Sequence, residues 1–203
     1  MPAQYEQSGR TQQKSRTRDQ LIAATRTLIA ERGATPTVAE AAAAASVSRT
    51  TAYRYFPSQG ALLVAAHPET DTTTLVPPDI GEDAEERLQM AVEAFHRLII
   101  DTESQQRTML HLSLQHGTPN DLPLRQGRAI GWFEDALAPL RPQLSEPDLH
   151  RLAVAIRSAV GIESMVWLTD VAGMSRIEAA KLMQWSAQAL LHEAMGQGSQ
   201  PRH

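Results

Sequence analysis

Apolar residues recur with helical spacing in the first part of the chain. Four of them and a threonine share one face of a helix predicted from about residue 15 to residue 32, at positions i, i+1, i+4, i+7 and i+8: Leu21, Ile22, Thr25, Leu28 and Ile29. Gly33 follows, where a helix commonly ends. Residues 1–14 are polar and glutamine-rich without an apolar stripe, so we expect a disordered arm there.

Three short helices follow, each beginning at a hydroxyl-bearing residue. Thr37 and Glu40 have the spacing of a capping box, in which each side chain accepts a hydrogen bond from the backbone amide of the other residue. Ser48 is expected to cap a helix that ends near residue 55, because Pro57 cannot continue it. Ser58 caps a fourth helix, which ends near residue 68. Residues 15–66 form the first predicted domain, which we call the head.

The remaining chain is also predicted to be helical. Residues 67–82 combine a threonine run with a proline pair and have no apolar stripe, so we expect a linker. Helical patterns follow over 83–102, 105–116, 121–139, 147–171 and 175–195. They form a second domain, the body, over 83–196, before a disordered tail at 197–203. Since no segment alternates like a strand, the predicted fold is all-α, with about nine helices.

Composition indicates a globular protein with an aliphatic core, because 42% of the residues are hydrophobic and only 4% are aromatic. The absence of cysteine excludes disulfides, thiolate metal sites and cysteine nucleophiles. No apolar run approaches the ~20 residues of a membrane span, and the polar amino terminus lacks a signal-peptide core. We therefore expect a cytoplasmic protein.

Charge is unevenly distributed along the chain. Residues 1–66 carry eight Lys/Arg and four Asp/Glu, the remainder carries 11 and 19, and the whole chain has a formal net charge of −4. Local positive charge favours binding to a polyanion through counterion release, whereas an acidic region repels phosphates. The head is therefore the part expected to meet nucleic acid.

The second and third predicted helices have the form of a helix-turn-helix, in which the second helix enters the major groove. On a helical wheel, one arc of this recognition helix carries Arg49, Thr50, Tyr53 and Arg54. The opposite arc carries Ala52, Tyr55 and Phe56. Arginine can contact guanine or phosphate, threonine a thymine methyl or phosphate, and tyrosine a phosphate oxygen. The first arc is the predicted DNA-facing side.

This segment resembles the head of the TetR family of bacterial transcriptional regulators. The resemblance rests on residues 37–42 (TVAEAA), 47–58 (VSRTTAYRYFPS) and 61–63 (ALL), and it covers about residues 15 to 66. The body resembles the family only in length and helicity. The resemblance implies a homodimer, a roughly palindromic double-stranded operator, and a small-molecule pocket in the body whose occupation releases the DNA.

The resemblance also implies roles for single residues. Thr37 would cap the second helix and contact phosphate, and Tyr53 and Tyr55 would contact phosphates, although Tyr55 is equally consistent with core packing. Val47 and Phe56 would pack. The predicted DNA-binding residues are Arg16, Thr37, Ser48, Arg49, Thr50, Thr51, Tyr53, Arg54 and Tyr55.

Two residues of the head depart from the family pattern. Ser46 stands in the turn where the family usually has glycine, so a positive φ would carry a cost there. Gln59 stands where the family usually has a lysine at the start of the fourth helix. We expect weaker or more salt-tolerant DNA binding as a result.

The body contains no complete catalytic or metal-binding motif. Glu93 and His96 form a single Glu-x-x-His, whereas a di-iron bundle needs a second copy. His111 and His116 lie off a common helical face, and neither HExxH, G-x-S-x-G nor a phosphate-binding glycine loop is present. We predict no enzyme activity, no cofactor and no metal.

Ligand pockets in helical bundles are mostly apolar with a few polar groups. The candidate ligand-binding residues are Met90, Phe95, Met109, His111, Trp132 and Trp167, each of which is also consistent with core packing. The last two helices carry long apolar stripes that favour a four-helix interface between two copies, with packing within one chain as the alternative. The predicted interface residues are Leu152, Ile156, Val160, Met183, Leu190 and Leu191.

These patterns predict a TetR-like regulator, a repressor that a small-molecule effector releases from its operator. Two alternatives stay open. One is a helical metal-dependent enzyme with a vestigial head, using His96 and His111, and the other is a dimeric DNA-binding regulator without an effector. DNA binding with a steep salt dependence would separate the regulators from the enzyme.

Overall fold

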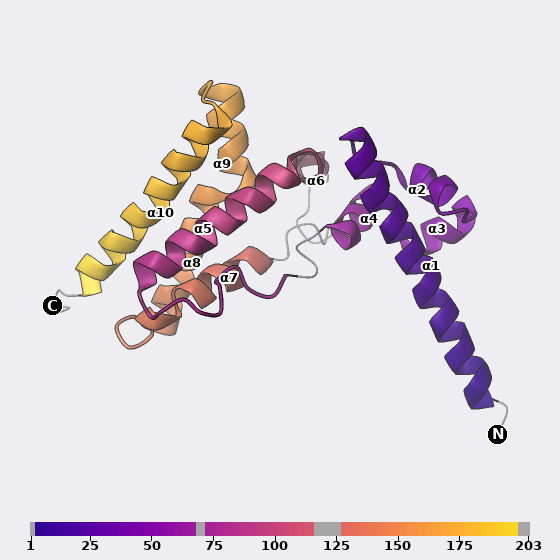
Figure 1. The fold of residues 1–203 in the computed structure, drawn as a ribbon, viewed down its shortest axis with the longest axis horizontal. Helices are drawn as coiled ribbons and strands as arrows, with labels where there is room; N and C mark the ends of the chain where they lie inside the picture. The colour runs from indigo at the N-terminus through magenta and orange to yellow at the C-terminus, as the bar shows by residue number, and fades with distance from the viewer. Residues whose placement is uncertain (1–2, 68–71, 116–126, 199–203) are drawn as a thin grey trace. The chain divides into compact units, whose positions relative to one another are not determined.

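The computed structural model describes residues 3–67, 72–115 and 127–198 (Figure 1). In these ranges the chain is helical and contains no β-strand, which confirms the all-α prediction. The elements are α1 (Ala3–Arg32), α2 (Val38–Ala44), α3 (Arg49–Tyr55), α4 (Gln59–Ala66), α5 (Ala84–Asp101), α6 (Glu103–Gln115), α7 (Arg128–Ala136), a 3-10 turn η3 (Ala138–Leu140), α8 (Glu146–Val160), α9 (Ile162–Val166), a π-helical turn η4 (Trp167–Val171) and α10 (Arg176–Gly198).

The chain divides into two compact units. The first comprises Met1–Thr70 and Ser104–Leu124, and the second comprises Asp71–Glu103 and Arg125–His203. Nearly all of α6 thus groups with the head, not with the body to which its sequence position assigned it. Residues 72–82, expected as a linker, pack on the second unit: Val76 is buried and the Thr74 hydroxyl donates to Asp135 at 2.6 Å. Single contacts such as these produce no periodic pattern of apolar residues, so the sequence did not indicate them.

Helix α1 begins at Ala3, so residues 3–14 are helical and not the disordered arm that their lack of an apolar stripe predicted. Most of these residues are good helix formers, and they extend a helix whose second half is stabilised by packing. In that half, Leu21 and Leu28 are buried, and the buried Thr25 hydroxyl donates to the Leu21 carbonyl at 2.7 Å. Most buried polar groups in proteins have such a partner.

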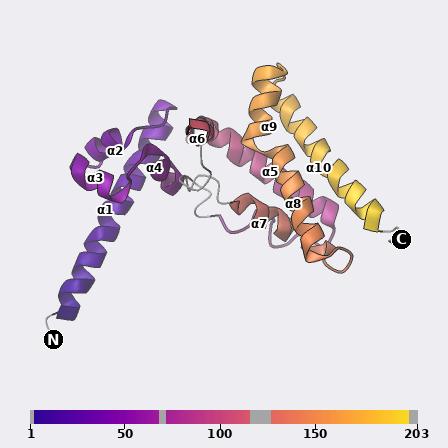
Figure 2. The ribbon, with the colours of Figure 1, turned by 180° about the vertical axis from the view of Figure 1, so that it is seen from behind.

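The first unit has a small aliphatic core in which α1 packs against α2 and α4, and α2 packs against α3 (Figure 1; Figure 2). Its buried members are Leu21, Val38, Ala41, Ala42, Ala52, Phe56 and Leu62. The alanines let α2 and α3 approach closely. Arg26 of α1 donates from Nε to the carbonyl of Ala66 at 2.9 Å, which satisfies a group at the end of α4.

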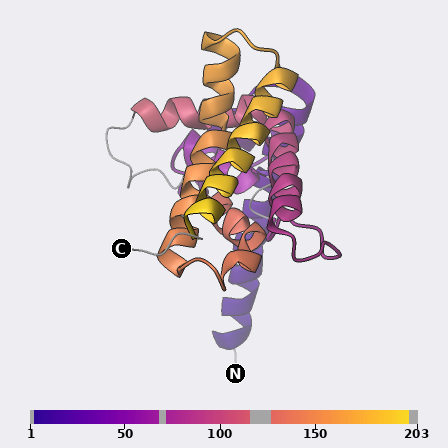
Figure 3. The same ribbon diagram turned by 90° about the vertical axis from the view of Figure 1, so that its left-hand side faces the viewer.

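The second unit is a helical bundle in which α10 lies along α8 and α5 packs against both α7 and α10 (Figure 3). Three aromatic residues are in contact at its centre. Phe95 meets the ring edges of Trp132 at 6.2 Å and Phe133 at 5.5 Å, measured between ring centroids. The Arg157 guanidinium lies 5.4 Å from the Phe95 centroid, a cation–π contact.

The helix predicted over 147–171 is interrupted at Gly161, whose backbone is extended (φ −80°, ψ 174°). The Arg157 guanidinium fills the space that a side chain at position 161 would need, and it pairs with Glu163 at 3.2 Å. By length and composition, Glu146–Val171 is apolar enough to cross a membrane. However, Gly161 interrupts this segment, and Leu149 and Ile156 are buried against other helices. Both features are typical of helices in the core of a protein.

Several predicted boundaries fall on residues that are not described. The described part of the helix expected at 121–139 begins at Arg128, and the expected break at 117–120 lies outside the described residues, as does His116. Helix α10 continues to Gly198, and the rest of the expected tail is likewise not described.

Candidate nucleic-acid interface

The first helix of the helix-turn-helix, α2, begins with the predicted capping box. The Thr37 amide donates to Glu40 Oε2 at 2.8 Å, and the Glu40 amide donates to Thr37 Oγ1 at 3.2 Å. Hydrogen bonds from the Thr37 amide and hydroxyl keep the pKa of the Glu40 carboxyl below its usual value. Arg32 adds an ion pair to Glu40 at 3.6 Å. This network fixes where α2 starts.

The turn between α2 and α3 is a Schellman motif. The Ser46 amide donates to the Ala43 carbonyl at 3.2 Å, and the Val47 amide donates to the Ala42 carbonyl at 2.9 Å. This geometry places Ser46 at φ +55°, and it is the single non-glycine residue with positive φ among those described. The cost expected from a serine at the family's glycine position is therefore present in the turn.

Ser46→Gly is expected to raise the free energy of unfolding by about 1 kcal/mol, because glycine adopts a positive φ without the clash of a Cβ. Urea unfolding followed by circular dichroism measures this change. Ser46→Ala is the matched control, since it removes the hydroxyl but keeps the Cβ and should give no such gain. A glycine variant no more stable than the alanine variant would refute the assignment of strain to this turn.

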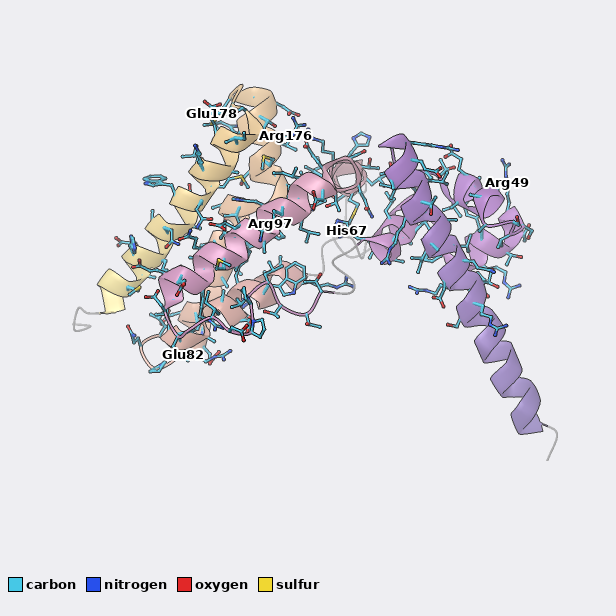
Figure 4. The ribbon with its side chains drawn as sticks, in the orientation of Figure 1. Arg49, His67, Glu82, Arg97, Arg176 and Glu178 are labelled. Carbon is cyan, nitrogen blue, oxygen red and sulfur yellow. The ribbon has the colours of Figure 1, made fainter. Side chains whose placement is uncertain are left out.

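Helix α3 presents the two sides that the helical wheel predicted. Ala52 and Phe56 are buried at 0% and 3% exposure, and Tyr55 is half-buried against the same core. Tyr55 thus packs on the core with part of its side chain, and its contact with phosphate stays a prediction. The opposite arc is exposed, and it carries Arg49, Thr50, Tyr53 and Arg54. Figure 4 shows Arg49 on the outer side of α3.

Two predicted DNA contacts serve the structure of α3 itself. Ser48 is the N-cap: its hydroxyl accepts from the Thr51 amide at 3.1 Å and donates to the Thr51 hydroxyl at 2.8 Å. Thr37 has the same kind of role at α2. The hydroxyls of Thr37 and Ser48 therefore accept hydrogen bonds from amides in the first turn of their helices, and the Thr51 hydroxyl binds Ser48. Their contribution to DNA binding remains a prediction.

The arginines of the head fall into two groups. Arg18 lies over the Phe56 ring at 5.6 Å, Arg26 binds the end of α4, and Arg32 pairs with Glu40. Exposed arginines that make no hydrogen bond or ion pair within the described chain are Arg16, Arg49 and Arg54. The sequence gives the number of arginines in the head. It does not tell which of them bind other parts of the protein, because that depends on which side chains come into contact after folding.

Gln59, the residue expected to weaken the phosphate track, is half-buried at the first position of α4. Its Nε2 donates to the carbonyls of Pro36 at 3.1 Å and Thr35 at 3.4 Å. Gln59 therefore links α4 to the loop before α2. Sequence reasoning treated this position only as a missing charge.

The candidate ligand residues lie in different environments. Phe95 and Trp132 are in contact in the core of the second unit, where Met90 is half-buried. Met109, half-buried, and His111, exposed, belong to α6 and hence to the first unit. Trp167 is 59% exposed and lines a surface groove of ≈ 400 Å³ together with Leu168, Leu182 and Met183.

The predicted interface residues pack mainly inside their own chain. Leu152, Ile156, Val160, Met183 and Leu191 are buried in the core of the second unit, and Leu190 is half-buried against it. A periodic stripe identifies the buried face of a helix but not the partner that buries it. The apolar side chains that the same region leaves exposed are Val154, Trp167, Val171, Ile177, Leu182 and Trp185.

The two histidines of the enzyme alternative have different surroundings. His96 is 6% exposed on α5, and burial lowers its pKa to about 4. His111 is exposed on α6, in the other unit. In the described ranges, no group of three or more His, Asp or Glu side chains is placed to hold a metal ion.

Comparison with known proteins addresses the head and the fold separately. Residues 21–66 match the model of a family described as bacterial regulatory proteins, tetR family. The fold is similar to the crystal structure of a TetR transcriptional regulator from Rhodococcus sp. RHA1, with a TM-score of 0.58 and 20% sequence identity. That match covers 89% of this chain and 98% of the other. The comparison with curated proteins gave no match.

Proposed function

We propose that the chain is a DNA-binding transcriptional regulator of the TetR type, a homodimeric repressor that a small-molecule effector releases from a palindromic operator; the family match of the head and the similar fold support this. The observation that carries this proposal is the outer arc of α3. There Arg49 and Arg54 are exposed and uncommitted, while the other side of the helix is buried. We place this activity in the cytoplasm.

The proposed dimer rests on the exposed apolar side chains of η4 and α10. Trp167, Val171, Ile177 and Trp185 are between 59% and 71% exposed, although tryptophan and isoleucine are usually buried. Large apolar side chains exposed on two elements that contact each other indicate an interaction site. In a two-fold dimer the same patch meets itself, so one apolar face suffices for both copies.

A dimer explains why a palindromic site is expected. Two copies of α3 related by a two-fold axis contact two half-sites about one helical turn of DNA apart, roughly 34 Å. An effector that binds better to a state with a different separation lowers the affinity for DNA. By linkage, DNA then lowers the affinity for the effector by the same factor.

DNA recognition is tested by selecting duplexes from a random pool with the purified chain. We expect selected sequences with two inverted half-sites and an affinity that falls steeply with salt. Failure to retain any duplex at low ionic strength would refute the proposal. Mapping the bound sites on chromosomal DNA then identifies the neighbouring genes and narrows the chemistry of the effector.

Trp185→Glu and Ile177→Glu are expected to dissociate the dimer, because each would bury two unpaired carboxylates at a self-complementary interface. The dimer dissociation constant, measured by sedimentation, should rise about 100-fold, equivalent to about 2.7 kcal/mol. Binding to the two-half-site duplex should weaken in parallel. Leu114→Glu is the control, since Leu114 is 76% exposed on α6, outside this face. Dimers of unchanged affinity in both test variants would argue against this interface.

A further inference from the structure

A groove on the surface of the second unit lies where α9 and η4 pack against α10 (Figure 3). Its volume of ≈ 400 Å³ is within the range of small-molecule sites. Two of its lining residues, Leu168 and Met183, are buried, whereas Trp167 and Leu182 are 59% and 37% exposed. The groove therefore has an apolar base and an aromatic ring that a ligand can reach from solvent.

The polar side chains that line the groove act as hydrogen-bond acceptors. The Ser164 hydroxyl donates its single proton to the Ser158 carbonyl at 2.7 Å, and the Ser186 hydroxyl donates its proton to the Leu182 carbonyl at 2.9 Å. Each hydroxyl oxygen can then only accept a further hydrogen bond. Glu163, the third polar side chain at this surface, is an acceptor when ionised. A polar ligand group that binds these side chains must therefore supply donors.

The Glu163 carboxylate is held in place by its own chain. Arg157 donates from Nη1 to Glu163 Oε2 at 3.2 Å, and its guanidinium lies 5.4 Å from the centroid of the Phe95 ring. A carboxylate has about four lone-pair positions, so one hydrogen bond from Arg157 does not exhaust its capacity as an acceptor. A fixed carboxylate also loses little side-chain entropy when a ligand binds.

Charge and aromatic chemistry favour a cation in this groove. Residues 67–203 carry 11 Lys/Arg and 19 Asp/Glu, so their summed field attracts cations. The face of a tryptophan ring adds a local attraction for a positive charge, and Trp167 lines the groove. An anion would instead meet the Glu163 carboxylate and the serine lone pairs, with the Trp167 indole N–H as a donor.

We propose that the groove binds an organic cation, an ammonium group on an apolar body. The nitrogen donates to Glu163, Ser164 and Ser186, and the body packs against Trp167. The inference rests on the proposed function in one respect, because Trp167 also belongs to the face proposed for the dimer. A cation in the groove then competes with the second copy, favours separated copies and weakens binding to an operator with two half-sites.

The first test needs no DNA and uses three probes of the same shape. These are 2-(1-naphthyl)ethylammonium, 2-(1-naphthyl)ethanol and 3-(1-naphthyl)propanoate, each titrated into the full chain by calorimetry. The ammonium should bind about tenfold more tightly than the alcohol, and the propanoate should bind most weakly. The same titrations on Ile177→Glu, in which the copies are expected to be separate, make the result independent of the dimer. Equal affinities for the three probes, or no binding of the ammonium to either chain, would overturn the proposal.

The second test locates the bound ammonium with paired variants. Trp167→Leu should weaken its binding about three- to thirtyfold, whereas Trp185→Leu, at a tryptophan outside the groove, should bind at least as tightly as the parent. Glu163→Gln should weaken binding about threefold or more. Glu82→Gln removes the same charge at an exposed site outside the groove and should change the affinity less than about twofold (Figure 4). If the groove variants bind as their controls do, the cation binds elsewhere and the assignment is wrong.

The third test addresses the competition with the second copy. Sedimentation of the parent chain with saturating ammonium probe should give a higher dimer dissociation constant than without it. By linkage, Ile177→Glu should bind the probe more tightly than the parent does. A dissociation constant that the probe does not change would contradict the competition. If the parent is monomeric without any probe, the proposed dimer fails, while the first two tests still decide the groove.

Discussion

Arg54→Ala is expected to weaken binding to a selected two-half-site duplex by about 30-fold or more. A bidentate contact to a base is worth about 1–3 kcal/mol, and a dimer loses it twice, once at each half-site. Arg54 is exposed on α3 and makes no hydrogen bond or ion pair within the described chain, so its removal disturbs no internal contact. The free energy of unfolding should therefore change by less than about 0.5 kcal/mol. Electrophoretic shifts and urea unfolding measure the two quantities.

The same experiment on Arg49 separates two kinds of contact. Loss of a phosphate contact at both half-sites lowers the salt slope by about two units and weakens all sequences equally, whereas loss of a base contact relaxes selectivity at one position of each half-site. Arg97→Ala is the matched control, because Arg97 is an exposed arginine on α5 of the second unit (Figure 4). Wild-type affinity in both Arg49→Ala and Arg54→Ala would mean that another face of the first unit contacts DNA.

The free energy of unfolding is expected to fall by about 3 kcal/mol between pH 7 and pH 4 through His96 alone. Burial lowers the pKa of this histidine from 6.5 to about 4, partly opposed by the charge of Glu93. The unfolded chain takes up the proton as the pH falls through about 6.5, while the folded chain does not until about 4. Stability from the neutral ring is therefore complete above pH 6.5 and is lost by up to about 1.4 kcal/mol per pH unit below it.

Urea unfolding between pH 4.5 and 7.5 measures this dependence. Carboxylates also titrate in the lower part of the range, so the informative quantity is the difference in slope between the parent chain and His96→Leu. The variant should be flatter, because it has no proton to take up at position 96. Equal slopes in the parent and His96→Leu would exclude His96 as the source.

Local signals in the head were sufficient to predict its helices. Thr37, Ser48 and Ser58 cap α2, α3 and α4 as expected, Gly33 adopts φ +62° where α1 ends, and α3 exposes the expected arc. Each of these features depends on residues within one or two turns of each other. The sequence therefore contains the whole physical cause: a side chain that satisfies a nearby amide, or an alternation of apolar and polar positions around one axis.

Features that depend on distant residues could not be predicted in this way. Apolar stripes on α8 and α10 indicated burial but were assigned to a dimer interface, whereas Ile156 and Met183 pack within the chain. The extension of α1 to Ala3 was missed for the opposite reason, since a helix can be continued by polar residues without any stripe.

By itself, the sequence determined the all-helical class, the capped helix-turn-helix with its outward cationic arc, and the resemblance of the head to the TetR family. Tertiary structure alone decided which arginines remain uncommitted, which apolar side chains stay exposed on α10, and that α6 joins the head through Thr108 and Gln105. The physical reason is the separation along the chain of the residues that interact. Capping and periodicity act between neighbours along the chain, whereas burial and hydrogen bonding between helices depend on which segments meet after folding.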